Sequence, residues 1–160
     1  HQLRPDVKIR FMESLAVKLR QEAENSIHYE GLYRWLRAHL RDDFPALESV
    51  DEVERLDNDL RAASFLVRDS GGYYRMAHGA LLDYLAARSL ARALSDGDPE
   101  ALEAPGLSAA LLALAAGALS RPPFRSDVAR ATARILLHSS RNPEAANNAR
   151  TLLDALSPRA

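Results

Sequence analysis

The fold is decided by Tyr73–Leu94, which reads YYRMAHGALLDYLAARSLARAL. Its first four residues are typical of a strand, His78-Gly79 indicates a turn, and the leucines that follow recur at helical spacing. We therefore expect His78 at the N-terminus of a helix, where backbone N–H groups lack internal partners and attract negative charge. Such a position suits a phosphate ligand, and it also suits a capping or packed side chain.

A β-hairpin is expected at the start of this stretch. Two β-prone runs, Ser64–Val67 and Tyr73–Met76, flank the turn sequence Asp69-Ser70-Gly71-Gly72. We expect the aromatic rings of Tyr73, Tyr74 and, on the following helix, Tyr84 to belong to the core.

Two helices are expected near the beginning of the chain. Pro5 suits the first turn of a helix, and an apolar stripe that includes Ile9 continues to about residue 22. After a short extended segment at Ile27, a second helix is expected over about Tyr29–Leu40, with Trp35 as its core anchor.

A third helix has the clearest start signal in the chain. Ser49–Glu52 forms a capping box, and an apolar face continues to about Ala63. Three helices followed by a hairpin is the order of a winged helix, which we place at residues 5–77. The fold class expected for the whole chain is mainly α.

The character of the sequence changes after a connecting helix over residues 78–95. A turn at Ser95–Pro99 is followed by helices rich in Ala and Leu, expected at about Leu107–Leu119, Asp127–His138 and Glu144–Leu156. Short helices of this kind, low in aromatic residues, resemble a helical repeat. Residues 96–160 are therefore expected to form a repeat-like α bundle.

Composition limits the possible functions. The 160 residues carry a formal net charge of −1, which excludes a bulk electrostatic attraction to nucleic acid. They contain no cysteine, which excludes disulfides and thiolate metal sites. No apolar run reaches the roughly 18 residues of a membrane span, so we expect a cytoplasmic protein without a membrane partner. The chain begins at His1, and we expect it to be a piece of a longer protein.

No pattern in the sequence predicts catalysis. A phosphate-binding loop of the form G-x-x-x-x-G-K-[ST] is absent, no two histidines have the i, i+4 spacing of a zinc site, and no G-x-S-x-G occurs. The carboxylate pairs Asp42-Asp43 and Asp51-Glu52 fall at expected helix ends, where solvated acids are ordinary. We expect no catalytic residue, no metal and no cofactor in this fragment, and no enzyme activity.

The motifs around the hairpin identify a family by resemblance. Four motifs resemble the winged-helix region of NACHT-type STAND ATPases, the bacterial relatives of NLR immune receptors: Asp59-Leu60-Arg61, Phe65-Leu66, Tyr74–His78 and Asp83–Arg88. The chain departs from the family pattern at three places: Met76 stands where Phe is favoured, Gly79-Ala80 where a basic residue and Ser are usual, and Asp83 where Glu is usual.

The resemblance implies a regulatory role in signal transduction. In that family the histidine at the position of His78 contacts the β-phosphate of ADP and holds the winged helix against the protein's own nucleotide-binding domain, an autoinhibited state. Exchange for ATP, with Mg, releases the winged helix and lets subunits oligomerise. The chain would then be the winged helix and the start of a superhelical sensor arm, with the P-loop domain elsewhere and a possible role in bacterial defence.

Two alternatives stay open at this stage. A winged helix often reads DNA with its third helix, but acids outnumber arginines over Val50–Arg61, and the wing offers only Arg68 and Arg75. DNA is therefore a less favoured partner, and a DNA-binding transcription regulator is the main alternative. The second alternative is a helical scaffold for protein interaction.

Overall fold

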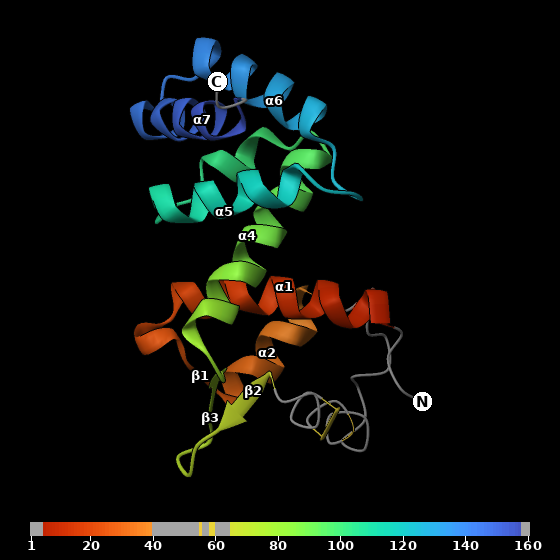
Figure 1. Ribbon diagram of the computed structural model, residues 1–160. Coiled ribbons are helices and arrows are strands. Elements are labelled where there is room, and N and C mark those ends of the chain that lie inside the picture. The colour runs from red at the N-terminus through yellow and green to blue at the C-terminus, as the bar shows by residue number, and fades with distance from the viewer. Residues whose placement is uncertain (1–4, 40–54, 56–57, 60–64, 158–160) are drawn as a thin grey trace. The chain divides into compact units, whose positions relative to one another are not determined.

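The computed structural model describes residues 5–39, 55, 58–59 and 65–157 (Figure 1). These ranges contain six α-helices and one three-stranded antiparallel sheet, so the chain is mainly helical, as expected. They fall into two compact units, His1–Leu82 and Asp83–Ala160, and the boundary lies inside helix α4 (Gly79–Ser95). None of the described helices is both long and apolar enough to cross a bilayer.

Unit 1 begins with two helices at the expected places. Helix α1 (Pro5–Gln21) is followed by a 3-10 turn, η1 (Ala23–Asn25), and strand β1 (Ile27–His28) leads directly into α2 (Tyr29–His39). The turn reverses the chain through positive φ angles at Glu24 (56°) and Asn25 (53°). Neither is glycine, and such a backbone is tolerated more readily by Asn than by Glu.

The expected hairpin is present, and β1 extends it to three strands. Strand β2 (Leu66–Arg68) pairs with β3 (Tyr73–Met76), β3 pairs with β1, and the order across the sheet is β1-β3-β2. At the turn, Asp69 Oδ1 accepts the N–H of Tyr73 at 2.9 Å. Gly72 has a φ of +85°, and a Cβ there would lie 2.8 Å from the Tyr29 ring, so this position needs glycine.

The core of unit 1 is built from large side chains. Alternate residues of a strand face opposite sides of the sheet, so Tyr74 is fully buried whereas Tyr73 is 45% exposed. The expectation that both belong to the core was therefore wrong for Tyr73. Ile9 on α1 is also 45% exposed, against expectation. Trp35 is only half-buried, with its ring centroid 6.5 Å from that of Phe11.

The expected third helix, with its capping box at Ser49–Glu52, lies outside the described residues except for Arg55, Asn58 and Asp59, which are helical. The end of the second helix at Leu40 and the first residue of the expected hairpin, Ser64, also lie outside them.

Unit 2 is helical, and its helices lie where the Ala- and Leu-rich runs predict them. After the 3-10 turn η2 (Pro99–Leu102) come α5 (Ala109–Leu119), α6 (Ser126–Ser139) and α7 (Pro143–Leu156). The Ser108 hydroxyl accepts the N–H of Leu111 at 3.1 Å and caps α5. The Asn142 side chain caps α7 by accepting the N–H of Glu144 at 3.0 Å.

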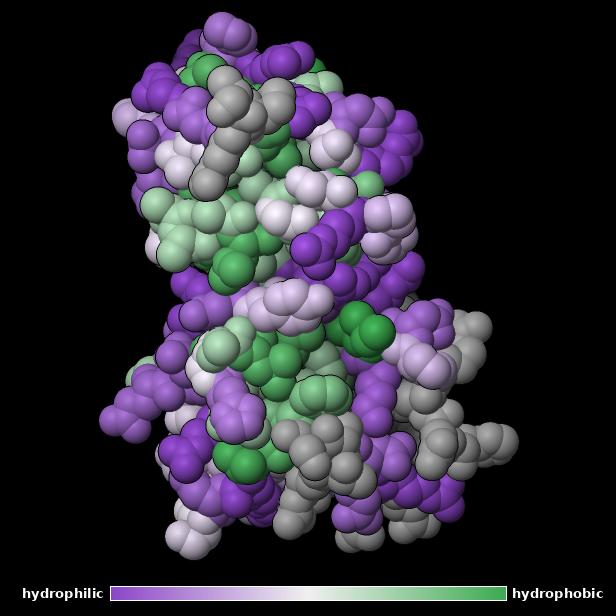
Figure 2. Space-filling view, in the orientation of Figure 1, coloured by the Kyte–Doolittle hydropathy of each residue, from purple (hydrophilic) through white to green (hydrophobic). Residues whose placement is uncertain are grey.

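Alanines and leucines together form the apolar core of unit 2. Helix α7 packs against both α5 and α6, and alanines on these helices are fully buried, among them Ala115, Ala129, Ala133 and Ala149. Figure 2 shows hydrophobic residues exposed over α5, a helix without a charged side chain, whose Leu114 is 44% exposed. Tyr84 on α4 is 51% exposed, so the expectation that its ring belongs to the core was wrong.

Candidate functional site

His78 lies between β3 and the first residue of α4, as the sequence predicts. Its backbone carbonyl accepts the N–H groups of Leu81 at 3.1 Å and Leu82 at 3.3 Å, so its main chain forms the start of the helix. Its side chain is exposed, and no hydrogen bond or ion pair holds the imidazole among the residues that the structure describes. The ring is therefore neither a cap nor part of the described core, and it is accessible to a ligand.

The surroundings of His78 leave this helix N-terminus open. A Cβ added at Gly79 would meet no atom within 4 Å, and Ala80 is exposed. The first turn of α4 contains no acidic residue. Free N–H groups at a helix start, without a competing carboxylate, attract an anion. The role of His78 as a phosphate contact stays a prediction.

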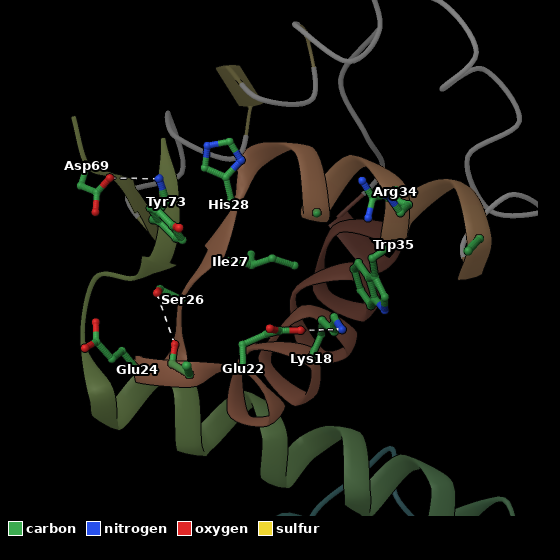
Figure 3. A pocket seen from close by; sticks show the side chains of 13 residues that line it. Lys18, Glu22, Glu24, Ser26, Ile27, His28, Arg34, Trp35, Asp69 and Tyr73 are labelled. Atoms are coloured by element: carbon green, nitrogen blue, oxygen red, sulfur yellow. Dashed lines mark hydrogen bonds and ion pairs between the residues drawn. The ribbon is translucent and has the colours of Figure 1, made fainter. Parts of the chain in front are cut away.

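A second candidate lies elsewhere in unit 1, at the edge of the sheet. A hollow of about 920 Å³ opens between the end of α1, strand β1, helix α2 and the β2–β3 turn (Figure 3). The described residues that line it are Lys18, Glu22, Ala23, Glu24, Ser26, Ile27, His28, Gly31, Arg34, Trp35, Ala38, Asp69 and Tyr73. The sequence did not predict this hollow, because its walls come from segments that are far apart in the chain, from Lys18 on α1 to Tyr73 on β3.

Hydrogen bonds and ring contacts fix the position of His28 within the hollow. Its Nδ1 accepts the N–H of Glu30 at 3.4 Å. The imidazole lies 4.4 Å from the Tyr29 ring and 5.1 Å, edge-on, from the Tyr73 ring. The His28 imidazole is thus held beside an exposed aromatic ring.

The charged side chains of the hollow differ in what they contact. Lys18 pairs with Glu22 at 2.7 Å, one helical turn away. The carboxylate of Asp69 is held by the Tyr73 N–H. Arg34, in contrast, is exposed and has no ion-pair partner among the described residues.

The basic residues of the hairpin are in different settings. The Arg68 guanidinium lies 4.8 Å from the centre of the Tyr29 ring and 5.6 Å from that of Tyr74, both cation–π distances. This stacking engages Arg68 within unit 1. Arg75 is exposed. The wing therefore offers one cation outside a ring contact, too few for a strong phosphate interaction.

The sequence offers acidic residues as possible catalytic or metal-binding groups. No group of three or more potential metal ligands occurs in the described part of the chain. The carboxylate pairs Asp42-Asp43 and Asp51-Glu52 lie outside it. In unit 2 the pKa of Asp127 is lowered from its ordinary value of 3.8, chiefly by the backbone N–H of Val128 and also by the Arg125 guanidinium. This is the usual chemistry of a helix start.

The chain matches no protein-family model, no curated protein and no solved structure.

Proposed function

We propose that this chain is a regulatory segment of a NACHT-type STAND ATPase, consisting of its winged helix and the start of its helical sensor arm. Two described helices precede the hairpin, and the expected third helix falls between α2 and β2, which is compatible with a winged helix over residues 5–77. The Tyr74–His78 and Asp83–Arg88 motifs carry the resemblance, and they lie on β3 and α4.

The observation that carries this proposal is the exposed imidazole of His78 at the open N-terminus of α4. In the autoinhibited state, this imidazole donates a hydrogen bond to the β-phosphate of ADP held by the nucleotide-binding domain in cis. The free N–H groups of the first helical turn add a favourable partial charge. ADP thereby favours the closed arrangement, because only that arrangement brings His78 to the phosphate.

The expected size of this effect is enough to operate a switch. A hydrogen bond to a charged group contributes about 1.5–3 kcal/mol, which corresponds to roughly a ten- to hundredfold shift between two states. Loss of the contact on exchange of ADP for ATP and Mg releases the segment and permits self-oligomerisation.

The decisive experiment uses the full-length protein and compares three variants. His78→Ala is expected to lose ADP during purification and to raise basal signalling, with an unchanged melting temperature. His138→Ala changes an exposed histidine on α6 and is the matched control, expected to behave as wild type. Leu85→Ala removes a buried side chain of α4 and is expected to cost about 2–5 kcal/mol of stability.

Retention of ADP by His78→Ala, with basal activity as low as wild type, would show that His78 is not the switch contact. For the 160-residue chain alone, we expect binding of free ADP to be weak, since a phosphate loop and a base pocket are missing from its sequence. Micromolar ADP affinity by isothermal titration calorimetry would contradict that expectation.

The DNA-binding alternative has less support, because Arg68 is stacked on Tyr29 and Tyr74 and the expected third helix is acidic. Fluorescence-anisotropy titration with mixed-sequence duplex DNA at low salt separates the two functions. Tight binding that weakens steeply with salt would favour the transcription regulator. The helical scaffold is favoured instead if the full-length protein binds neither DNA nor ADP.

A further inference from the structure

We propose that the hollow beside β1 is a binding site for an extended peptide segment of a partner protein, with a basic residue toward the β2–β3 turn and an acidic residue toward α2. The site does not include His78, so this inference goes beyond the proposed function and does not depend on it.

The hollow runs along a free sheet edge. In the order β1-β3-β2, strand β1 is paired on one side only among the described strands. Successive side chains of a strand face opposite sides of the sheet. Three consecutive residues, Ser26, Ile27 and His28, line the hollow, so it borders β1 along its length. It also reaches the sheet face on which Tyr73 of β3 lies opposite His28.

The backbone register leaves a donor on this edge. Tyr29 donates its N–H to the Gly72 carbonyl at 2.9 Å, and Ile27 is aligned with Tyr74 two residues earlier. Inter-strand bonding alternates along an antiparallel pair, so the N–H of His28 points away from β3. An unpaired strand edge of this kind accepts an added strand, which is a common mode of peptide recognition.

The charges of the hollow are separated across the strand. In Figure 3, Asp69 and Glu24 lie on one side of Ile27, and Arg34 lies on the opposite side. Lys18 is already neutralised by Glu22 at 2.7 Å. The available charges are therefore acidic on the turn side and basic on the α2 side, and this separation is complementary to a peptide whose own charges are opposite in sign and similarly separated.

Two aromatic side chains give the peptide apolar contact. Tyr73 is 45% exposed and Trp35 is half-buried, and they lie on opposite sides of the buried Ile27 (Figure 3). Aromatic residues in such positions are typical anchors of binding surfaces. The volume of about 920 Å³ also lies within the range of ligand sites.

The probe for a first test is the capped pentapeptide acetyl-Lys-Thr-Val-Thr-Glu-amide, which spans about 17 Å when extended. Trp35 is the single tryptophan of the chain, so its fluorescence reports occupancy of the hollow without a label. We expect a saturable change in emission with the full 160-residue chain. A control peptide with Gln in place of both charged residues should bind about tenfold more weakly.

Charge variants of the protein locate the peptide. Arg34→Gln should weaken binding by about fivefold, whereas Arg37→Gln, an exposed arginine of α2 outside the hollow, should not. Asp69→Asn keeps an oxygen that can accept the Tyr73 N–H but removes the negative charge. This variant should bind the same peptide more weakly, by a factor similar to that of Arg34→Gln. Glu30→Gln, an exposed acid on α2 that does not line the hollow, is its control.

Backbone-modified peptides test the strand pairing itself. An added strand bonds to an edge through alternate residues, so N-methylation of the set of amides that faces β1 should abolish binding, whereas N-methylation of the other set should leave binding unchanged. The proposal is overturned if no saturable fluorescence change occurs at millimolar peptide, or if the neutral peptide binds equally well. It is also overturned if neither N-methylated set loses affinity, which would indicate a site for a small zwitterion.

Discussion

The hydrophobic cores of the two units differ in the residue types that they contain. Unit 1 buries large and irregular side chains, including Phe11, Met12 and Tyr74, around a small sheet. Unit 2 buries alanines and leucines between helices, and several alanines of α6 and α7 have no exposed surface at all. Small residues let helices approach closely, so close packing in unit 2 requires the small volume of these alanine side chains as well as the apolar surface of the leucines.

The two units also differ in where candidate ligand positions occur. A short sheet with two helices leaves gaps at strand edges and turns, and the hollow beside β1 lies in such a place. In unit 2, helix α7 packs against both α5 and α6. Both candidate ligand positions, the hollow and His78, lie in unit 1. The mixed packing of helices and strands in unit 1 therefore holds both candidate sites.

The largest expected effect tests the aromatic core of unit 1. Tyr74→Ala removes a fully buried ring and should lower the free energy of unfolding by about 3–5 kcal/mol. Urea denaturation followed by Trp35 fluorescence, which reports on unit 1, measures the change. Tyr74→Phe is the control: the Tyr74 hydroxyl is buried without a hydrogen-bond partner among the described residues, so its removal should cost less than about 1 kcal/mol. A large loss in Tyr74→Phe would show that the hydroxyl has a partner outside them.

The reverse change tests the small-residue core of unit 2. Ala133→Leu inserts a larger side chain at a fully buried position of α6, and overpacking should lower stability by about 1–3 kcal/mol. Ala131→Leu, at an exposed position of the same helix, should change it by no more than about 0.5 kcal/mol. Thermal unfolding followed by far-UV circular dichroism compares the two. Equal melting temperatures would mean that unit 2 is not closely packed at α6.

A third prediction tests a buried hydrogen bond within unit 2. Asn148 is 4% exposed and donates from Nδ2 to the carbonyl of Leu102 at 3.0 Å, which ties α7 to η2. Asn148→Ala leaves that buried carbonyl without this donor and should cost about 1–3 kcal/mol by chemical denaturation. Asn147→Ala, at the exposed neighbouring position, should be close to neutral. Equal losses in both variants would show that the Asn148–Leu102 hydrogen bond is not the cause of the effect, because alanine has a higher helix propensity than asparagine at either position.

The smallest expected effect concerns pH. The pKa of Asp127 is lowered by the backbone N–H of Val128 and by Arg125, so its carboxylate stabilises the folded state above the ordinary value of 3.8. This contribution is lost as the pH falls through the lower folded pKa. Asp127→Asn should therefore flatten the acid limb of a stability curve measured by circular dichroism between pH 7 and 2. Asp154→Asn, an exposed acid near the C-terminal end of α7, is the control, and an identical acid limb in all three proteins would contradict the assignment.

Local patterns in the sequence were sufficient for most of the helices and for the hairpin. The boundaries of α5, α6 and α7 agree with the Ala- and Leu-rich runs to within two residues. The turn between β2 and β3 follows from Asp69-Ser70-Gly71-Gly72, because glycine at the last position permits the positive φ found there. These features depend on residues close together in the chain. The position of His78 at a helix start belongs to the same class, while its phosphate role and the domain limits at residues 77 and 95 remain predictions.

Contacts between segments distant in sequence determine which of the aromatic residues are buried and where a hollow forms. Tyr73 and Tyr74 are adjacent and chemically identical, and the pairing of β3 with β1 and β2 places one outside and the other in the core. Trp35 appears in the sequence as a core anchor, yet it lines a hollow whose opposite wall, the β2–β3 turn, lies more than 30 residues further along the chain. Periodicity fixes which side of an element is apolar, but exposure depends on what packs against that side, and this is set by contacts between segments distant in sequence.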